Sequence, residues 1–209
     1  MKVLEFAQGT DEWRAARAGK VTASRIDAVL AKIASGEAAA RRDYRAQIVA
    51  EILTARPQDD GYVNYEMQWG IDQEPMARSA YEVSRGLLIR EVGFVIHPEL
   101  ERSGASPDGL LGKDGMCEIK CPKTATHLQW MWEGKVPAKH QPQMHWQMAC
   151  TGRKWNDFVS YDPRLPEELQ LFVVRLPRDE GRIRDIEREV EKFLSDVDAM
   201  LAKIKAIKK

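Results

Sequence analysis

Blocks of hydrophobic and polar residues along this chain predict helices at both ends and strands in the middle. Apolar residues spaced by threes and fours indicate helices, and short apolar runs bounded by Gly or Pro indicate strands. The expected helices span about 10–17, Thr22 or Ser24 to Ile33, 38–55, 67–85 with a start or kink at Pro75, 126–133 and 138–151. The expected strands span 87–96, 102–105, a hairpin over 110–121, 156–161 and 169–176. Helices before, between and after a mixed central β-sheet predict an α/β (α+β) fold.

The last part of the chain predicts one long amphipathic helix. Its apolar stripe comprises Ile183, Ile186, Val190, Phe193, Val197, Met200, Ile204 and Ile207. We expect the stripe to pack on the body of the same domain, and a contact between subunits is the alternative. No internal repeat, low-complexity segment or linker is visible, so residues 1–209 are expected to form a single domain.

Composition sets bounds on the cellular setting. Of the residues, 44% are hydrophobic and 31% are charged, with no apolar run of membrane-spanning length and no signal peptide. Three cysteines without disulfide-like spacing indicate a reducing compartment, so we expect a cytoplasmic protein.

The formal net charge is zero, which argues against nucleic-acid binding by bulk charge. Basic residues gather locally instead. They lie at Arg14, Arg17, Lys20 and Arg25, at Arg41, Arg42 and Arg45, and at Lys203, Lys205, Lys208 and Lys209. Solvated helix faces are the commoner explanation for such clusters.

The most informative residues surround the predicted hairpin. The segment Gly112–Gly115 is typical of a hairpin turn between Ser106-Pro107-Asp108-Gly109 and Glu118-Ile119-Lys120. We therefore expect the carboxylates of Asp108 and Glu118 on adjacent antiparallel strands. Glu118 and Lys120 share one side of that strand because side chains alternate with period 2. Two carboxylates suit a hard divalent cation, and a neighbouring lysine suits phosphodiester hydrolysis. A solvated hairpin with a surface Glu–Lys pair is the alternative from these residues alone.

Other polar residues are candidates to join this site. Glu74 is either a third carboxylate or an ordinary acid at a helix N-terminus. The 138–151 helix carries Gln143 and Gln147 at i, i+4. Their amides could hydrogen-bond phosphate, water or carboxylates, or could form a polar solvent face.

The segment from Arg17 to Ser24 is a candidate anion site. Arginine offers a planar fork for phosphate, and Thr22 and Ser24 lie at a predicted helix start. An ordinary helix cap with a basic neighbour is the alternative. The four histidines lack compact metal-ligand spacing and are expected to be structural or surface residues.

Taken together, these motifs resemble the phage-type recombination exonucleases typified by lambda exonuclease. The resemblance runs over nearly the whole chain. It includes Gln8-Gly9-Thr10-Asp11-Glu12-Trp13, Arg17, Thr22-Ala23-Ser24, Trp69-Gly70 with Glu74, Ser106-Pro107-Asp108-Gly109, Glu118-Ile119-Lys120-Cys121-Pro122, Gln143 and Tyr161-Asp162-Pro163-Arg164.

The resemblance implies a restriction-endonuclease-like core of the PD-(D/E)xK superfamily. The implied activity is 5′-to-3′ degradation of double-stranded DNA from 5′-phosphorylated ends, leaving 3′ overhangs for recombination. Mg²⁺, with Mn²⁺ as a substitute, is expected as cofactor. Family members form toroidal homotrimers and work with a single-strand annealing protein.

Residue roles carried over by position are also implied by the resemblance. Asp108, Glu118 and the backbone carbonyl of Ile119 look like metal ligands, and Lys120 would orient or activate water. Glu74 and Gln143 would complete the catalytic network.

Arg17, Thr22 and Ser24 would bind the 5′-phosphate. His145 departs from the family pattern, because the best-known relative has a second glutamine there. A site-specific or structure-specific endonuclease with the same core is the main alternative. A non-catalytic DNA-end-binding protein is a further one.

Overall fold

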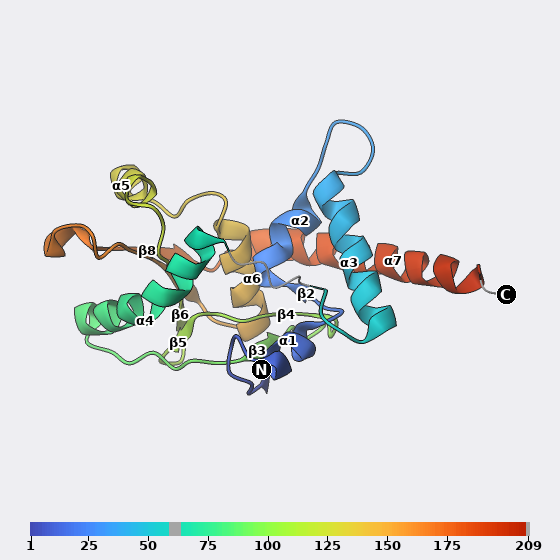
Figure 1. Cartoon of the computed structure of the whole chain (residues 1–209), viewed down its shortest axis with the longest axis horizontal. Coiled ribbons are helices and arrows are strands. Elements are labelled where there is room, and N and C mark those ends of the chain that lie inside the picture. The colour runs from blue at the N-terminus through green and yellow to red at the C-terminus, as the bar shows by residue number, and fades with distance from the viewer. Residues whose placement is uncertain (59–63, 208–209) are drawn as a thin grey trace.

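The computed structural model describes residues 1–58 and 64–207, so Lys208 and Lys209 of the last basic cluster lie outside the described residues. Its α-helices are α1 (Asp11–Arg17), α2 (Ile26–Leu30), α3 (Ala39–Thr54), α4 (Tyr65–Arg85), α5 (Thr124–Glu133), α6 (Gln141–Thr151) and α7 (Glu180–Ala206). Its strands are β1 (Lys2–Leu4), β2 (Val21–Thr22), β3 (Phe94–Ile96), β4 (Ser103–Ala105), β5 (Gly109–Leu111), β6 (Gly115–Lys120), β7 (Trp155–Tyr161) and β8 (Leu171–Pro177). Figure 1 shows helices on several sides of the strands, as expected for the α/β (α+β) class.

The strands form two four-stranded sheets, in the orders β1-β3-β4-β2 and β5-β6-β7-β8. Each sheet is mixed, because β2–β4 and β6–β7 are parallel and the other pairs are antiparallel. The parallel pair β6–β7 needs a long crossover, which the segment carrying α5 and α6 provides. The predicted hairpin is confirmed as β5–β6, with Leu111 paired to Gly115.

Several boundaries differ from the sequence expectation. β1 was not predicted, because three residues are too few to show a strand pattern. It pairs with β3 and so provides hydrogen-bond partners for the backbone of that strand. The strand expected over 87–96 forms only at Phe94–Ile96, with one isolated bridge at Arg90. The helix expected from Thr22 or Ser24 begins there as a 3₁₀ turn over Ala23–Arg25 with Thr22 at its N-cap, but α2 ends at Leu30, short of the expected Ile33.

α4 passes through Pro75 without starting there. Its true start is Tyr65, because the side chain of Asn64 caps it by accepting a 2.8 Å hydrogen bond from Met67 N. Ala77 and Tyr81 of α4 are fully buried and pack with Cys117 and other residues of the second sheet. This packing holds α4 against β6 and outweighs the hydrogen bond that a proline removes.

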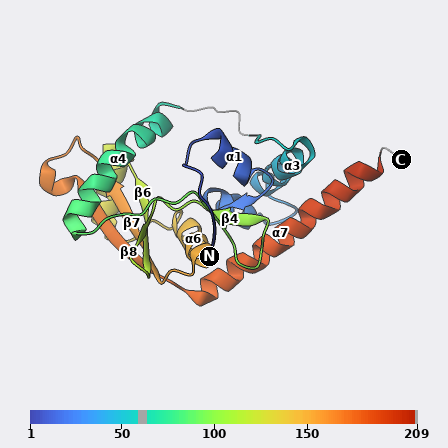
Figure 2. The ribbon, with the colours of Figure 1, turned by 90° about the horizontal axis from the view of Figure 1, so that it is seen from below.

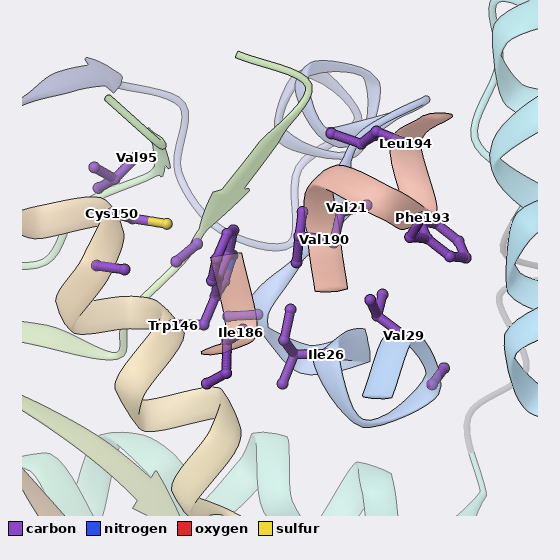
Figure 3. Close-up of a cluster of buried hydrophobic side chains, with 14 of the residues drawn as sticks. Val21, Ile26, Val29, Val95, Trp146, Cys150, Ile186, Val190, Phe193 and Leu194 are labelled. Carbon is purple, nitrogen blue, oxygen red and sulfur yellow. The ribbon is translucent and has the colours of Figure 1, made fainter. Parts of the chain in front are cut away.

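The long C-terminal helix packs on the body of the domain, as its apolar stripe predicted. Figure 2 shows α7 running along one side of the molecule. Phe193 stacks on Tyr44 of α3 with ring centroids 5.4 Å apart. Figure 3 shows Ile186, Val190 and Phe193 among the buried side chains of this core.

The end of the stripe departs from expectation: Ile207 follows the last helical residue and is 78% exposed. None of the helices in the described ranges is long and apolar enough to cross a membrane.

Candidate active site

The β5–β6 hairpin brings the two predicted ligands of a metal ion together. Asp108 directly precedes β5, and its Oδ2 accepts a 2.6 Å hydrogen bond from the backbone N of Ile119 on β6. Gly109 is required beside it, because a Cβ there would lie 2.0 Å from Cγ2 of Ile89. The register thus places the Asp108 carboxylate next to the Glu118–Lys120 segment, as the sequence predicted.

The loop before Asp108 is fixed by residues from the start of the chain. Trp13 Nε1 donates a 2.9 Å hydrogen bond to Ser106 Oγ. Gln8 Nε2 donates to the carbonyls of Pro107 and Val92, both at 2.9 Å. The Gln8–Trp13 motif therefore acts on the site indirectly, by holding the loop that carries Asp108.

Glu118 is buried, with 1% of its surface exposed, yet both carboxylate oxygens have donors. Its Oε1 accepts hydrogen bonds from Lys120 Nζ and from Gln143 Nε2. Its Oε2 accepts a 2.5 Å hydrogen bond from Gln147 Nε2, and Gln147 Oε1 accepts one of 2.8 Å from Asn156 Nδ2. A buried carboxylate is stable only with such donors, so this network replaces the lost water.

The alternative of a solvated hairpin is therefore wrong for Glu118. The glutamines of α6 do not form a polar face toward solvent, which was the alternative interpretation. Gln147 is 0% exposed, and Gln143 is half-buried against Glu118.

Glu74 reaches the same region from the middle of α4, so its interpretation as an N-terminal helix acid was wrong. Arg78, one turn later, donates a 2.7 Å hydrogen bond to Glu74 Oε1 and a 2.6 Å hydrogen bond to the carbonyl of Asp108. Arg78 therefore ties the third carboxylate to the loop that carries the first.

Crowded carboxylates shift the ionisation of the whole cluster. Burial, and then the neighbouring Glu118, raise the pKa of Asp108 well above its usual range. Burial also raises the pKa of Glu74. Burial by itself lowers the pKa of Lys120, but the carboxylates of Glu118 and Asp108 outweigh it and the net pKa is raised. Lys120 thus stays an ammonium, and the site has an excess of negative charge that a cation would relieve.

The donor set fits a magnesium ion. No group of three His, Cys, Asp or Glu side chains in the described part of the chain could hold a metal ion alone. Mg²⁺ is usually bound by one or two carboxylates together with water and substrate phosphates, so a complete protein cage is not needed. Asp108 and Glu118, with the Ile119 carbonyl between Glu118 and Lys120 in sequence, are compatible with that requirement.

The three residues predicted to bind phosphate also lie together. Arg17 Nη2 donates a 3.4 Å hydrogen bond to Ser24 Oγ, which lies 3.3 Å from Thr22 Oγ1. They line a pocket of about 330 Å³, and Lys20 and Arg25 line the same pocket. Ser24 and Gln143 line a neighbouring cavity of about 230 Å³. Ser24 thus lines both cavities, and Gln143, which lines the second one, donates a hydrogen bond to Glu118.

Gln147 was a candidate with two interpretations, and its hydrogen bond to Glu118 confirms the one in which an amide binds a carboxylate. Sequence reasoning missed Arg78 and Asn156. Arg78 could have been found, because it lies four residues from Glu74 on the same helix. Asn156 carried no local signal, since only the parallel pairing of β7 with β6 places it there.

His145 does not contact Glu118 in the structure. It lines a separate pocket with residues of α2 and α7, and burial lowers its pKa. The second amide on Glu118 is that of Gln147.

Comparison with known proteins identifies the family. A family model described as the YqaJ-like viral recombinase domain matches residues 12–154. The chain belongs to the YqaJ-like viral recombinase family, which is lambda-exonuclease-like. The matched segment includes every predicted site residue, from Arg17 to Gln143.

Solved structures agree with this assignment of the YqaJ-like recombinase. LHK-Exo in complex with dAMP is 45% identical, with a TM-score of 0.89 over 95% of this chain and 98% of that one. The alkaline exonuclease LHK-Exo from Laribacter hongkongensis is 44% identical, with a TM-score of 0.87 over the same shares.

A phage-related exonuclease from Haemophilus somnus 129PT has a TM-score of 0.70 at 17% identity, covering 88% of this chain and 96% of that one, which shows the fold alone. No curated protein sequence matches the chain.

Proposed function

We propose that this YqaJ-like recombinase is a metal-dependent 5′-to-3′ exonuclease. Its substrate would be double-stranded DNA with 5′-phosphorylated ends, and its product a 3′ single-stranded overhang for recombination. The observation that carries the proposal is the hydrogen-bonded cluster of Asp108, Glu118, Lys120 and Gln143. Gln143 shares a cavity with Ser24, which also lines the Arg17 pocket. The similarity to LHK-Exo, an alkaline exonuclease that has also been solved with dAMP, supports a DNA exonuclease.

Asp108, Glu118 and the carbonyl of Ile119 are the proposed ligands of Mg²⁺, with Mn²⁺ as a substitute. The chemistry that such an ion supplies is polarisation of a phosphate oxygen and acidification of water. Lys120, held as an ammonium beside Glu118, places positive charge where negative charge develops on phosphorus.

Glu74 and Gln143 orient groups around the reacting phosphate. Arg17, Thr22 and Ser24 hold the terminal 5′-phosphate, so that the bond to be broken lies one nucleotide further along, at the carboxylates. Positioning of this kind supplies a large part of the barrier reduction in many enzymes.

Assembly into a toroidal homotrimer belongs to the same proposal. Large apolar side chains stay exposed on α4, such as Ile71 at 58% and Val83 at 85%. A ring around DNA would also compensate for the formal net charge of zero, because enclosure keeps an enzyme on its substrate with less electrostatic attraction. The proposed partner is a single-strand annealing protein, and the proposed setting is the cytoplasm of a bacterial host.

The test is nucleotide release from linear duplex DNA with 5′-phosphate ends, with and without Mg²⁺. We expect Mg²⁺-dependent release of mononucleotides and no cleavage of closed circular DNA. Nicking or linearisation of the circle would instead indicate an endonuclease. Binding to DNA ends without any release in Mg²⁺ or Mn²⁺ would indicate a non-catalytic end-binding protein.

A further inference from the structure

A further pocket lies directly beside the end of β6. Its volume is about 210 Å³, and Cys121, the residue after Lys120, forms part of its wall. Aromatic and cationic side chains dominate the lining: Tyr65, Trp69, Trp130, Lys123, Lys139 and Arg164. One carboxylate, Glu66, also lines it and forms an ion pair with Lys123, which a phosphate would have to replace. Lys139 also lines the cavity that contains Ser24 and Gln143, so this pocket adjoins the proposed path of DNA.

The pocket is a built feature, held by contacts between distant segments. The guanidinium carbon of Arg164 lies 4.4 Å from the ring centre of Trp69. Arg164 also donates a 2.7 Å hydrogen bond to Asp162 and a 3.0 Å hydrogen bond to the carbonyl of Pro122. Trp69 and Arg164 are both motif residues that the nuclease mechanism leaves without a role.

Two features of the lining call for an anionic or acceptor-bearing ligand. Trp69 Nε1 is buried, and no acceptor among the described residues reaches it. α5 begins at Thr124 beside the pocket, and Lys123 before it provides no side-chain cap. The start of a helix carries partial positive charge and free N–H groups, which bind phosphate.

We propose that this pocket binds one nucleotide of the DNA strand that the exonuclease leaves unhydrolysed. The base would lie against Tyr65 and Trp69, and its phosphate at Lys123 and the start of α5. Proteins hold single strands by this combination of aromatic faces and cationic side chains. A pocket of about 210 Å³ is too small for a duplex, so the proposed ligand is single-stranded DNA. The choice of strand rests on the proposed exonuclease function.

The test measures binding of an oligothymidylate with a fluorescent 5′ label by anisotropy, in buffer without divalent metal. The label covers the 5′ end of the oligonucleotide, so this end cannot bind in the proposed 5′-phosphate pocket. The absence of metal prevents hydrolysis. Tyr65→Ala and Lys123→Ala are the test variants, because both side chains are exposed and line this pocket.

Trp132→Ala and Lys154→Ala are the matched controls. Trp132 is an exposed aromatic residue away from the pocket. Lys154 forms an exposed ion pair with Asp114, as Lys123 does with Glu66.

We expect roughly tenfold weaker binding for Tyr65→Ala, within the range for loss of one base–aromatic stack. Lys123→Ala should also make the slope of log affinity against log salt less steep by about 0.7, the value for one phosphate contact on a single strand. The two controls should match the wild type.

Wild-type affinity in both test variants would overturn the proposal. So would a change in oligomeric state without a change in DNA affinity, since the pocket would then be a subunit contact.

Nucleotide release from duplex ends separates this proposal from the proposed function. A wild type that releases nothing in Mg²⁺ or Mn²⁺, yet loses single-strand affinity in the test variants, contradicts the nuclease and supports a single-strand site. If the wild type releases nucleotides and both test variants keep wild-type affinity for the single strand, the result supports the nuclease and contradicts the proposed single-strand site.

Discussion

Replacing Gln147 with leucine should destabilise the protein strongly, although no sequence motif marks this residue. The side chain is 0% exposed and lies between two polar groups. It donates to Glu118 Oε2 and accepts from Asn156 Nδ2. Leucine has a similar volume but no polar atoms, so the cavity stays filled and both partners lose their hydrogen bond.

The magnitude follows from those two losses. A hydrogen bond to a charged group is worth about 1.5–3 kcal/mol, and a buried unsatisfied donor costs about 1–3 kcal/mol. The sum is roughly 2.5–6 kcal/mol of unfolding free energy, and one kcal/mol shifts the Tm of a protein this size by about 2–4 °C. We therefore expect Tm to fall by at least about 5 °C.

Urea denaturation and thermal melting, both without divalent metal, measure this effect. Gln129→Leu is the matched control, because Gln129 donates a 2.9 Å hydrogen bond to Glu133 on the exposed face of α5. The control should change the unfolding free energy by about 0.5 kcal/mol or less. Equal stability of Gln147→Leu and Gln129→Leu would refute the argument that Glu118 depends on buried amide donors.

Four further predictions test the site and its surroundings. Asp108→Ala should abolish cleavage and keep the fold, since it removes a proposed ligand and relieves repulsion; near-normal nuclease rates in Mg²⁺ would contradict the metal assignment. Lys120→Ala should still bind DNA but turn over roughly 10²–10³-fold more slowly, the usual loss for one preorganised donor, as single-turnover rates would reveal. Arg17→Ala should lose most of the preference for 5′-phosphorylated over 5′-hydroxyl ends, measured by initial rates on both substrates; an unchanged preference would make it an ordinary surface arginine. Burial lowers the pKa of His97 to about 4, so its contribution to stability should be present above about pH 6.5 and disappear as pH falls toward 4. Unfolding free energies from urea titrations across that range should show a loss of about 3 kcal/mol, which His97→Gln should reduce.

The sequence was sufficient for the carboxylate pair because local spacing determined it. A hairpin of this length places Asp108 beside the Glu118–Lys120 segment once the strand period is known. Periodicity likewise predicted the buried face of the C-terminal helix. The long helix through Pro75 was harder, because its stability comes from burial of Ala77 and Tyr81 in the tertiary structure.

Other parts of the site depend on contacts between distant segments. Asn156 reaches Gln147 only because β7 pairs in parallel with β6, and no local pattern reports that register. The link from Trp13 to Ser106 spans 93 positions, so the motif could be noticed in the sequence while its action on the Asp108 loop could not be derived. Residues 59–63, between α3 and α4, lie outside the described part of the chain.

The close approach of Gly109 to Ile89 has an evolutionary consequence. A methyl group at position 109 would overlap Cγ2 of Ile89, because its carbon would lie only 2.0 Å from that atom. Alanine at position 109 can therefore be accepted only after Ile89 has been replaced by a smaller residue. The replacement at position 89 does not depend on position 109 in this way. Descendant sequences should therefore acquire the change at position 89 before the change at position 109. The neighbour of Asp108 is thus constrained by the mutational history of a residue twenty positions earlier in the chain.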